Sequence, residues 1–143
     1  MLLTSQPVGG NTVSTIVADE VILTSQLVAL NASSRVVGAS GVFTADKFMV
    51  AGVAKSGAGI GATIQIETGF GQTVAVQFGS APGAASNGDP VFLSDTSGEA
   101  TLSPPDVVAA NRARFFVGIL RGADGVTTTP DVLFQPRLIA YRI

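Results

Sequence analysis

The sequence contains no cysteine and no histidine, and these two absences exclude most of the familiar kinds of active site. Without cysteine there is no disulfide, no thiol nucleophile and no thiolate ligand for a metal. Without histidine there is no imidazole to serve as a general acid, a general base or a metal ligand. Ser-His-Asp hydrolases, Cys-His enzymes and the usual zinc sites are therefore excluded.

Charged residues are also scarce. They make up 13% of the chain, against about 25% in an average globular protein. The formal net charge of -2 argues against a nucleic-acid partner, because phosphate binding relies on clustered lysine and arginine. Lysine and glutamate usually protect the edges of sheets from self-association. A β-rich chain with so few of them is predicted to form oligomers or to carry a large docking surface.

Long apolar runs are missing as well. Every run is shorter than the roughly 18 residues that suggest a membrane span. The first residues carry no positive charge, so they do not resemble a signal peptide. We therefore expect a protein that is made in a cytoplasm and has no membrane partner.

The chain does contain many short strand patterns separated by turn residues. Apolar and polar residues alternate over residues 63–67 and 73–78, as a sheet with one buried face requires. Many short strands with regular turns predict an all-β fold, a small barrel or a sandwich. The predicted strands cover residues 36–37, 42–43, 47–54, 63–67, 73–78, 90–94, 113–120, 132–134 and 138–143. Residues 105–112 suit a short helix and an irregular loop about equally.

One strand pattern occurs twice along the chain. Residues 27–30 (LVAL) match residues 90–93 (PVFL), residues 51–55 (AGVAK) match residues 117–121 (VGILR), and an apolar strand follows in each copy, at 63–67 and at 131–135. The match predicts two pseudo-repeats of one β unit, over about residues 25–69 and 88–135. Such a duplication is more typical of a structural or binding module than of an enzyme.

The sequence divides into an extended N-terminal arm, residues 1–20, and a β-barrel or sandwich domain, residues 21–143. Proline and glycine in the first residues argue against a helix. The arm is either a frayed terminus or a strap that becomes ordered on a neighbouring subunit. The β-branched residues Val13, Ile16 and Val17 favour the strap, and we predict that they contact a partner.

Phe115 and Phe116 are adjacent in a predicted strand, so their side chains point to opposite faces. One of them must leave the domain's own core unless both faces of the strand are covered. We therefore predict that Phe115 or Phe116 lies at a seam between subunits.

Two motifs suggest ligands, and simpler interpretations account for both. Residues 57–62 (GAGIGA) match a loose dinucleotide fingerprint, but a strand pattern follows where that fingerprint needs a helix. Residues 95–99 carry two carboxylates, yet they lack the repeated oxygen ligands that calcium requires and suit a simple turn. The sequence thus predicts no catalytic residue, no cofactor and no metal site.

Residues 88–94 (GDPVFLS), residues 97–101 (SGEAT) and residues 117–120 (VGIL) together resemble a segment common in structural proteins of tailed bacteriophages, in which a GDPVYLS strand leads to a VGIA strand. The ending DVLFQP at residues 131–136 is similar to the ILFNP found there. Residues 72–90 resemble the small β-barrel family of phage head decoration, or cement, proteins. The likeness covers roughly the last half of the chain.

The resemblance implies a non-enzymatic virion protein on the outer surface of a phage capsid, at local three-fold positions. Its expected partners are the major capsid protein, whose contacts it would stabilise, and itself, as a homotrimer. A tail, neck or fibre component is the main alternative, because the same segment occurs in those proteins. A carbohydrate-binding β domain is a further alternative, although tryptophan is absent and Tyr141 is the only tyrosine.

Overall fold

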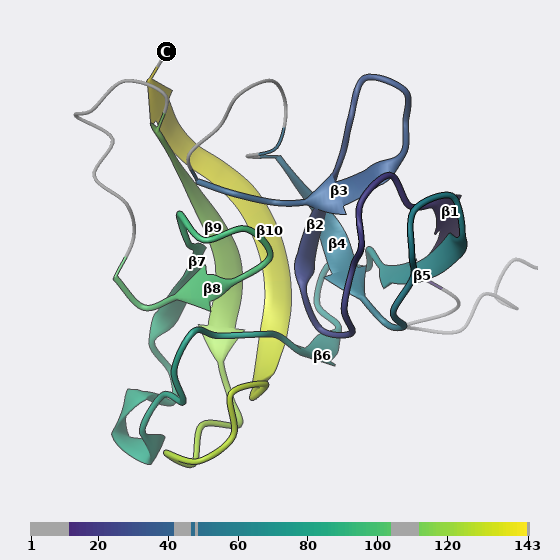
Figure 1. Cartoon of the computed structure of the whole chain (residues 1–143). Helices are drawn as coiled ribbons and strands as arrows, with labels where there is room; N and C mark the ends of the chain where they lie inside the picture. The colour runs from purple at the N-terminus through teal and green to yellow at the C-terminus, as the bar shows by residue number, and fades with distance from the viewer. Residues whose placement is uncertain (1–11, 42–46, 48, 104–111, 143) are drawn as a thin grey trace, which may run out of the picture.

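A computed structural model describes residues 12–41, 47, 49–103 and 112–142. These residues form ten strands and a short 3-10 helix, η2 (Ala84–Ser86), which confirms the all-β prediction. The first sheet contains β1 (Val13–Val17), β2 (Leu27–Leu30), β3 (Val36–Gly38), β4 (Val50–Ala54) and β5 (Thr63–Glu67), and the second contains β6 (Thr73–Ala75), β7 (Pro90–Leu93), β8 (Ala100–Thr101), β9 (Arg112–Leu120) and β10 (Asp131–Arg142). Both sheets are curled, and the long strands β9 and β10 lie side by side in the second sheet and bend along their length (Figure 1).

The two sheets are copies of one topology. The strand order is β1-β5-β4-β2-β3 in the first and β6-β10-β9-β7-β8 in the second, so each strand of the first has a counterpart five places later. A parallel bridge curls each sheet towards closure, between Ala18 and Val36 in one and between Phe78 and Ala100 in the other. We call strands β1 to β5 the first half and β6 to β10 the second half. The predicted pseudo-repeats therefore exist, and each also includes a leading strand, β1 or β6.

Main-chain hydrogen bonds repeat in detail between the halves. Ser25 N donates to Ala54 O over 2.8 Å, and its counterpart Gly88 N donates to Leu120 O over the same distance. Ser25 and Gly88 both have positive φ, 73° and 95°. Glycine adopts this conformation at no steric cost, whereas serine adopts it rarely. The shared backbone at this turn identifies the duplication more firmly than the residue types do.

Each half contains a bulge beside a glycine that the next strand approaches closely. The pairing of β2 with β4 shifts register after Val28 opposite Gly52, and that of β7 with β9 shifts after Val91 opposite Gly118. A Cβ atom would lie 2.4 Å from Glu67 O at Gly52, and closer still to the next strand's carbonyl at Gly118. Glycine is therefore required at both positions by packing against main chain.

The sheets form two hydrophobic clusters. We call the face of each sheet that lines its own curl the inner face and the opposite face the outer face. The inner face of the first sheet contributes to a small cluster of Ala18, Ile22, Val28, Val36, Ala54, Ile64 and Ile66, with Ile16, Leu30 and Ala58 at its margin. The larger cluster joins outer-face residues of the first half (Leu27, Ala29, Val37, Ala39, Val50 and Val53) to inner-face residues of the second (among them Val76, Phe78, Leu93, Phe115, Val117 and Phe134). β2 is thus buried on both faces, which explains why LVAL shows no alternation.

The halves are also joined through the turn that connects β7 to β8. Leu27 N donates to Gly98 O over 2.9 Å, and Gly98 N donates to Ala39 O over 2.8 Å. Gly98 has a positive φ of 81°. Residues 95–99 are therefore a turn, as predicted, and this turn contacts the outer side of the first sheet.

Residues 13–17 were expected to be part of an extended arm, and they form a strand of the first sheet. β1 pairs with β5 from Val13 opposite Glu67 to Val17 opposite Thr63. β-branched residues favour such pairing, and Ile16 packs against the small cluster. Residue 20 is therefore not a boundary between an arm and a domain. The rest of the expected arm, residues 1–11, lies outside the described residues.

The C-terminal strand differs from the prediction. Two strands were predicted, over residues 132–134 and 138–143, and the structure has one, β10, with register shifts between Phe134 and Arg137 and between Leu138 and Ala140. Pro136 falls within the first shift, where its missing N–H does not interrupt a regular ladder. The predicted strand at residues 42–43 falls outside the described residues. So does the possible helix at residues 105–112, except for Arg112, which is the first residue of β9.

Candidate interaction surfaces

Acidic side chains are the main potential metal ligands in this chain, because it has no cysteine or histidine. Among the described residues, they do not gather in any group of three or more that could hold a metal ion. Within the same residues, no helix has the length and apolar character needed to cross a membrane. Three features of the described surface could bind a partner: a depression beside β8, a group of exposed aliphatic side chains and one face of the second sheet.

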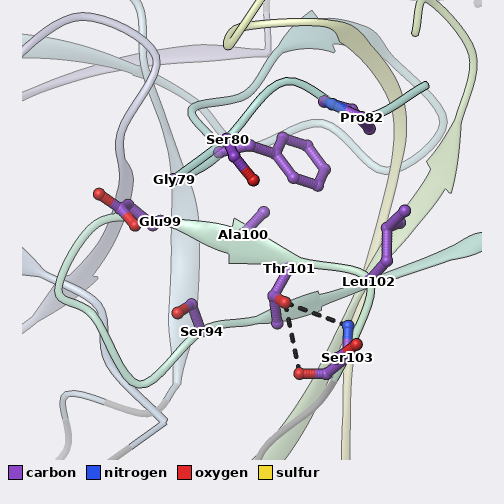
Figure 2. Close-up of a pocket in the computed structure, with 10 residues that line it drawn as sticks. Gly79, Ser80, Pro82, Ser94, Glu99, Ala100, Thr101, Leu102 and Ser103 are labelled. Atoms are coloured by element: carbon purple, nitrogen blue, oxygen red, sulfur yellow. Dashed lines mark hydrogen bonds between the residues drawn. The ribbon is translucent and has the colours of Figure 1, made fainter. Parts of the chain in front are cut away.

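A depression of about 360 Å³ lies beside β8 (Figure 2). Thr101 Oγ1 accepts a hydrogen bond from Ser103 N over 3.1 Å at its edge. The lining combines hydroxyl groups, one carboxylate and apolar side chains, from Phe78, Gly79, Ser80, Pro82, Ser94, Glu99, Ala100, Thr101, Leu102 and Ser103. The hydroxyl groups and the carboxylate of this lining can hydrogen-bond a small polar molecule.

Exposed aliphatic side chains lie at one end of the first half. Val21, Leu23 and Ile60 are 66%, 61% and 70% exposed. Their backbone is ordered, because Ile22 and Ala58 exchange two main-chain hydrogen bonds of 2.9 Å. We call Val21, Leu23 and Ile60 the apolar rim. Neighbouring exposed apolar side chains often mark binding surfaces, and the bridge between Ile22 and Ala58 brings together the two segments that carry these residues.

The outer face of the second sheet carries aromatic and apolar side chains in two rows. The pairing of strands places Thr101, Phe92, Phe116 and Arg137 in one row. The rings of Phe92 and Phe116 are 6.0 Å apart and nearly perpendicular. The guanidinium of Arg137 lies 4.9 Å from the centroid of Phe116, a cation–π distance.

The second row of this face consists of Pro90, Ile119 and Leu133. Pro90 is exposed, while Ile119 and Leu133 are half-buried. Aromatic residues and arginine are the types enriched at the centres of protein interfaces. The two rows together therefore suit a protein partner.

The predicted contact residues lie in two separate places. Phe115 is 3% exposed and belongs to the cluster between the sheets, whereas Phe116 is 7% exposed beneath Phe92 and Arg137. Both rings are thus mostly buried by residues of the same chain, although the outer face of β9 is still half-exposed at Ile119. Val13 and Val17 are half-buried on β1, in the other sheet. The structure does not bring these two groups together.

Sequence reasoning missed Phe92, Ile119 and Arg137 as neighbours of Phe116. Strand alternation alone places Phe92 and Phe116 on some face of a sheet, but it does not say that β7, β9 and β10 lie side by side. The match between the repeats does indicate that Phe92 and Ile119 lie on one face of the sheet. Phe92 and Ile119 align with Ala29 and Val53, which are buried in the first half.

Glu20 connects three segments of the first half. Its carboxylate accepts a hydrogen bond from Gly38 N over 2.8 Å and another from Lys47 Nζ over 2.9 Å. Partial burial raises the pKa of this carboxyl, but the bond from Gly38 and the bond and charge of Lys47 together lower it more. The net pKa of Glu20 is therefore below its ordinary value.

Replacing Glu20 with glutamine is expected to reduce the free energy of unfolding by less than about 1 kcal/mol at neutral pH, because the ion pair is over one-third exposed and screened by salt. A carboxyl with a lowered folded pKa stabilises the protein above its unfolded pKa, and this stabilisation is lost as the pH falls through the folded pKa. The difference between wild type and Glu20→Gln in urea unfolding should thus shrink on acidification. Ser80→Ala, at the equivalent position of the second half, is the control and should show no such trend. A difference that grows as the pH falls would contradict this assignment.

Comparison with known proteins does not supply a family. No protein-family model matches the chain, and no curated protein matches it.

Proposed function

We propose that this chain is a virion structural protein that binds the outer surface of a tailed-phage capsid and stabilises contacts between major capsid proteins. The sequence resemblance over the last half of the chain suggests this class of protein. The proposal needs a rigid body that presents binding surfaces and performs no chemistry. Two β halves that pack on each other through one hydrophobic cluster, with few charged residues, suit that role.

The apolar rim is the observation that best supports contact with a capsid. Val21, Leu23 and Ile60 are each more than half exposed. The segments that carry them are held together by the two hydrogen bonds between Ile22 and Ala58, which pack in the small cluster of the first half. Burial of such side chains stabilises a complex by roughly 25 cal/mol for each Å² of apolar area removed from water. A modest contact of this kind becomes effective when it is repeated over a whole shell.

Charged substitutions in the rim are expected to weaken binding to undecorated phage heads. Leu23→Asp and Ile60→Asp should each reduce affinity at least about tenfold, because each places a charge in an apolar contact. Val126→Asp is a matched control, since Val126 is the counterpart of Ile60 in the second half and is 82% exposed. Binding is measured by cosedimentation with heads, and circular dichroism verifies the fold of each variant.

The result of this experiment separates the candidate functions. Unchanged binding by both rim variants would remove the rim from the mechanism. Failure of the wild-type chain to bind heads, with binding to tails instead, would favour a tail, neck or fibre role. Deleting residues 1–11, which leaves β1 intact, tests whether the N-terminal segment contributes to head binding. A positive glycan-binding screen would favour the carbohydrate-binding alternative.

A further inference from the structure

The two halves meet through unlike surfaces. The outer face of the first half packs on the inner face of the second, where Leu27, Ala29 and Val53 are at most 1% exposed. The same positions in the second half are Pro90, Phe92 and Ile119. Of these, Pro90 is exposed, and Phe92 and Ile119 are half-buried. The outer face of the second half thus corresponds, position by position, to the outer face of the first half. The face of the first half is buried, whereas that of the second half is partly exposed.

The inner faces differ in the opposite sense, because here the residues of the second half are the more buried ones. In the second half, Val76 and Leu93 are fully buried because the first half covers them. Their counterparts Ile16 and Leu30 are only half-buried. Met49, the counterpart of the buried Phe115, is 46% exposed. The inner face of the first half is therefore open around Ile16, Leu30 and Met49, whereas the residues of the small cluster on the same face are at most 2% exposed.

We propose that these two surfaces meet between copies of the chain, with the outer face of the second half packing on the inner face of the first half of the next copy. The contact within the chain is the precedent, because it joins the same two kinds of surface. A contact between unlike surfaces is heterologous, so it produces a closed ring or an open filament. The inference rests on the proposed function in one respect, since it identifies the surfaces for the self-association expected of a decoration protein.

The contact between copies should be weaker than the contact within the chain. Leu27 N donates a hydrogen bond to Gly98 O in the second half, whereas its counterpart Pro90 has no N–H to donate. The contact between copies then depends on burial of apolar and aromatic side chains, with Phe92 and Phe116 near its centre. We therefore expect association that is reversible on dilution.

The experiment measures the mass of the full-length chain by sedimentation over a range of concentrations. Wild type should form oligomers that dissociate on dilution. Ile119→Asp changes the outer face of the second half, and Met49→Asp changes the inner face of the first. Each is expected to weaken association at least about tenfold, whereas Val126→Asp should leave it unchanged. Circular dichroism and urea unfolding verify that each variant is folded.

Mixing the two variants tests whether the contact is heterologous. Ile119→Asp retains an intact inner face and Met49→Asp retains an intact outer face, so the mixture should form heterodimers that cannot extend or close. An isologous contact through the outer face alone would make Met49→Asp behave like wild type, and that result would overturn the proposal. A wild-type chain that stays monomeric would also overturn it. If deletion of residues 1–11 then produced oligomers, the chain's own N-terminal segment would be what covers the inner face.

The outcome can be separated from that of the proposed function. A monomeric chain that still binds heads refutes the contact between copies and leaves the capsid role standing. An oligomer that does not bind heads supports the contact and refutes the capsid role.

Discussion

Replacing Gly118 with alanine is expected to destabilise the protein by about 3 kcal/mol or more, at the upper end of the cost of overpacking. The added Cβ atom would lie 1.9 Å from Leu133 O and 2.9 Å from Leu133 C. Both atoms belong to the main chain of β10, which pairs with β9 over most of its length. Neither strand can move without breaking this pairing. Urea unfolding measures the loss.

Gly83→Ala is the matched control for this substitution. No heavy atom outside its chain neighbours lies within 4 Å of a Cβ atom at Gly83, and its φ of -74° suits any residue. Its free energy of unfolding should stay within about 0.5 kcal/mol of wild type. Wild-type stability in Gly118→Ala would show that β9 and β10 are not packed as described.

Aspartate at two equivalent positions is expected to have opposite effects on folding. Val53 and Ile119 occupy the same place on the outer faces of the two halves. Val53 is 1% exposed between the sheets, so Val53→Asp buries a carboxylate without a partner and should cost more than about 3 kcal/mol. Ile119 is half-buried at the surface, so Ile119→Asp should cost less than about 1 kcal/mol.

Thermal unfolding of dilute protein measures this pair, because dilution removes any contribution from self-association. The expected result is a folded Ile119→Asp and a largely unfolded Val53→Asp. Equal losses in the two variants would mean that both outer faces are buried within one chain. That outcome would also remove the surface on which association between copies depends.

Much of the fold follows from local patterns in the sequence. Alternation over residues 63–67 and 73–78 predicts strands, and β5 and β6 lie there, although β6 ends at Ala75. The glycine-rich run at residues 57–62 leads into β5. This confirms the prediction of a strand, and not the helix of a dinucleotide site, after the run. The match of residues 27–30 with 90–93 is also correct, since these residues form β2 and β7 in equivalent places.

The third part of the repeat match is displaced by two residues. The match of residues 63–67 with 131–135 makes Gln135 the counterpart of Glu67. In the structure, the counterpart of Glu67 is Leu133. The close approach of these strands to Gly52 and Gly118 identifies the correct pair. Counted from these glycines, Glu67 and Leu133 are the same distance along the chain, so the two connections have equal length. The sequence match assumed two extra residues before residue 131, because it aligned the apolar runs by residue type alone.

The candidate surfaces depend on tertiary packing that the sequence does not reveal. Composition alone predicts a large docking surface, but not its place. The guanidinium of Arg137 lies over the ring of Phe116 because β9 and β10 are neighbours in the sheet. The exposure of Leu23 and Ile60 follows from the bridge between Ile22 and Ala58, which joins residues far apart in the chain. Local periodicity contains no information about either pairing.

Cryo-electron microscopy of purified particles tests the central claim most directly. The account predicts density for this chain in many copies on the outer surface of the head, with the apolar rim against the major capsid protein. Density confined to the tail, or particles that lack the chain altogether, would contradict it.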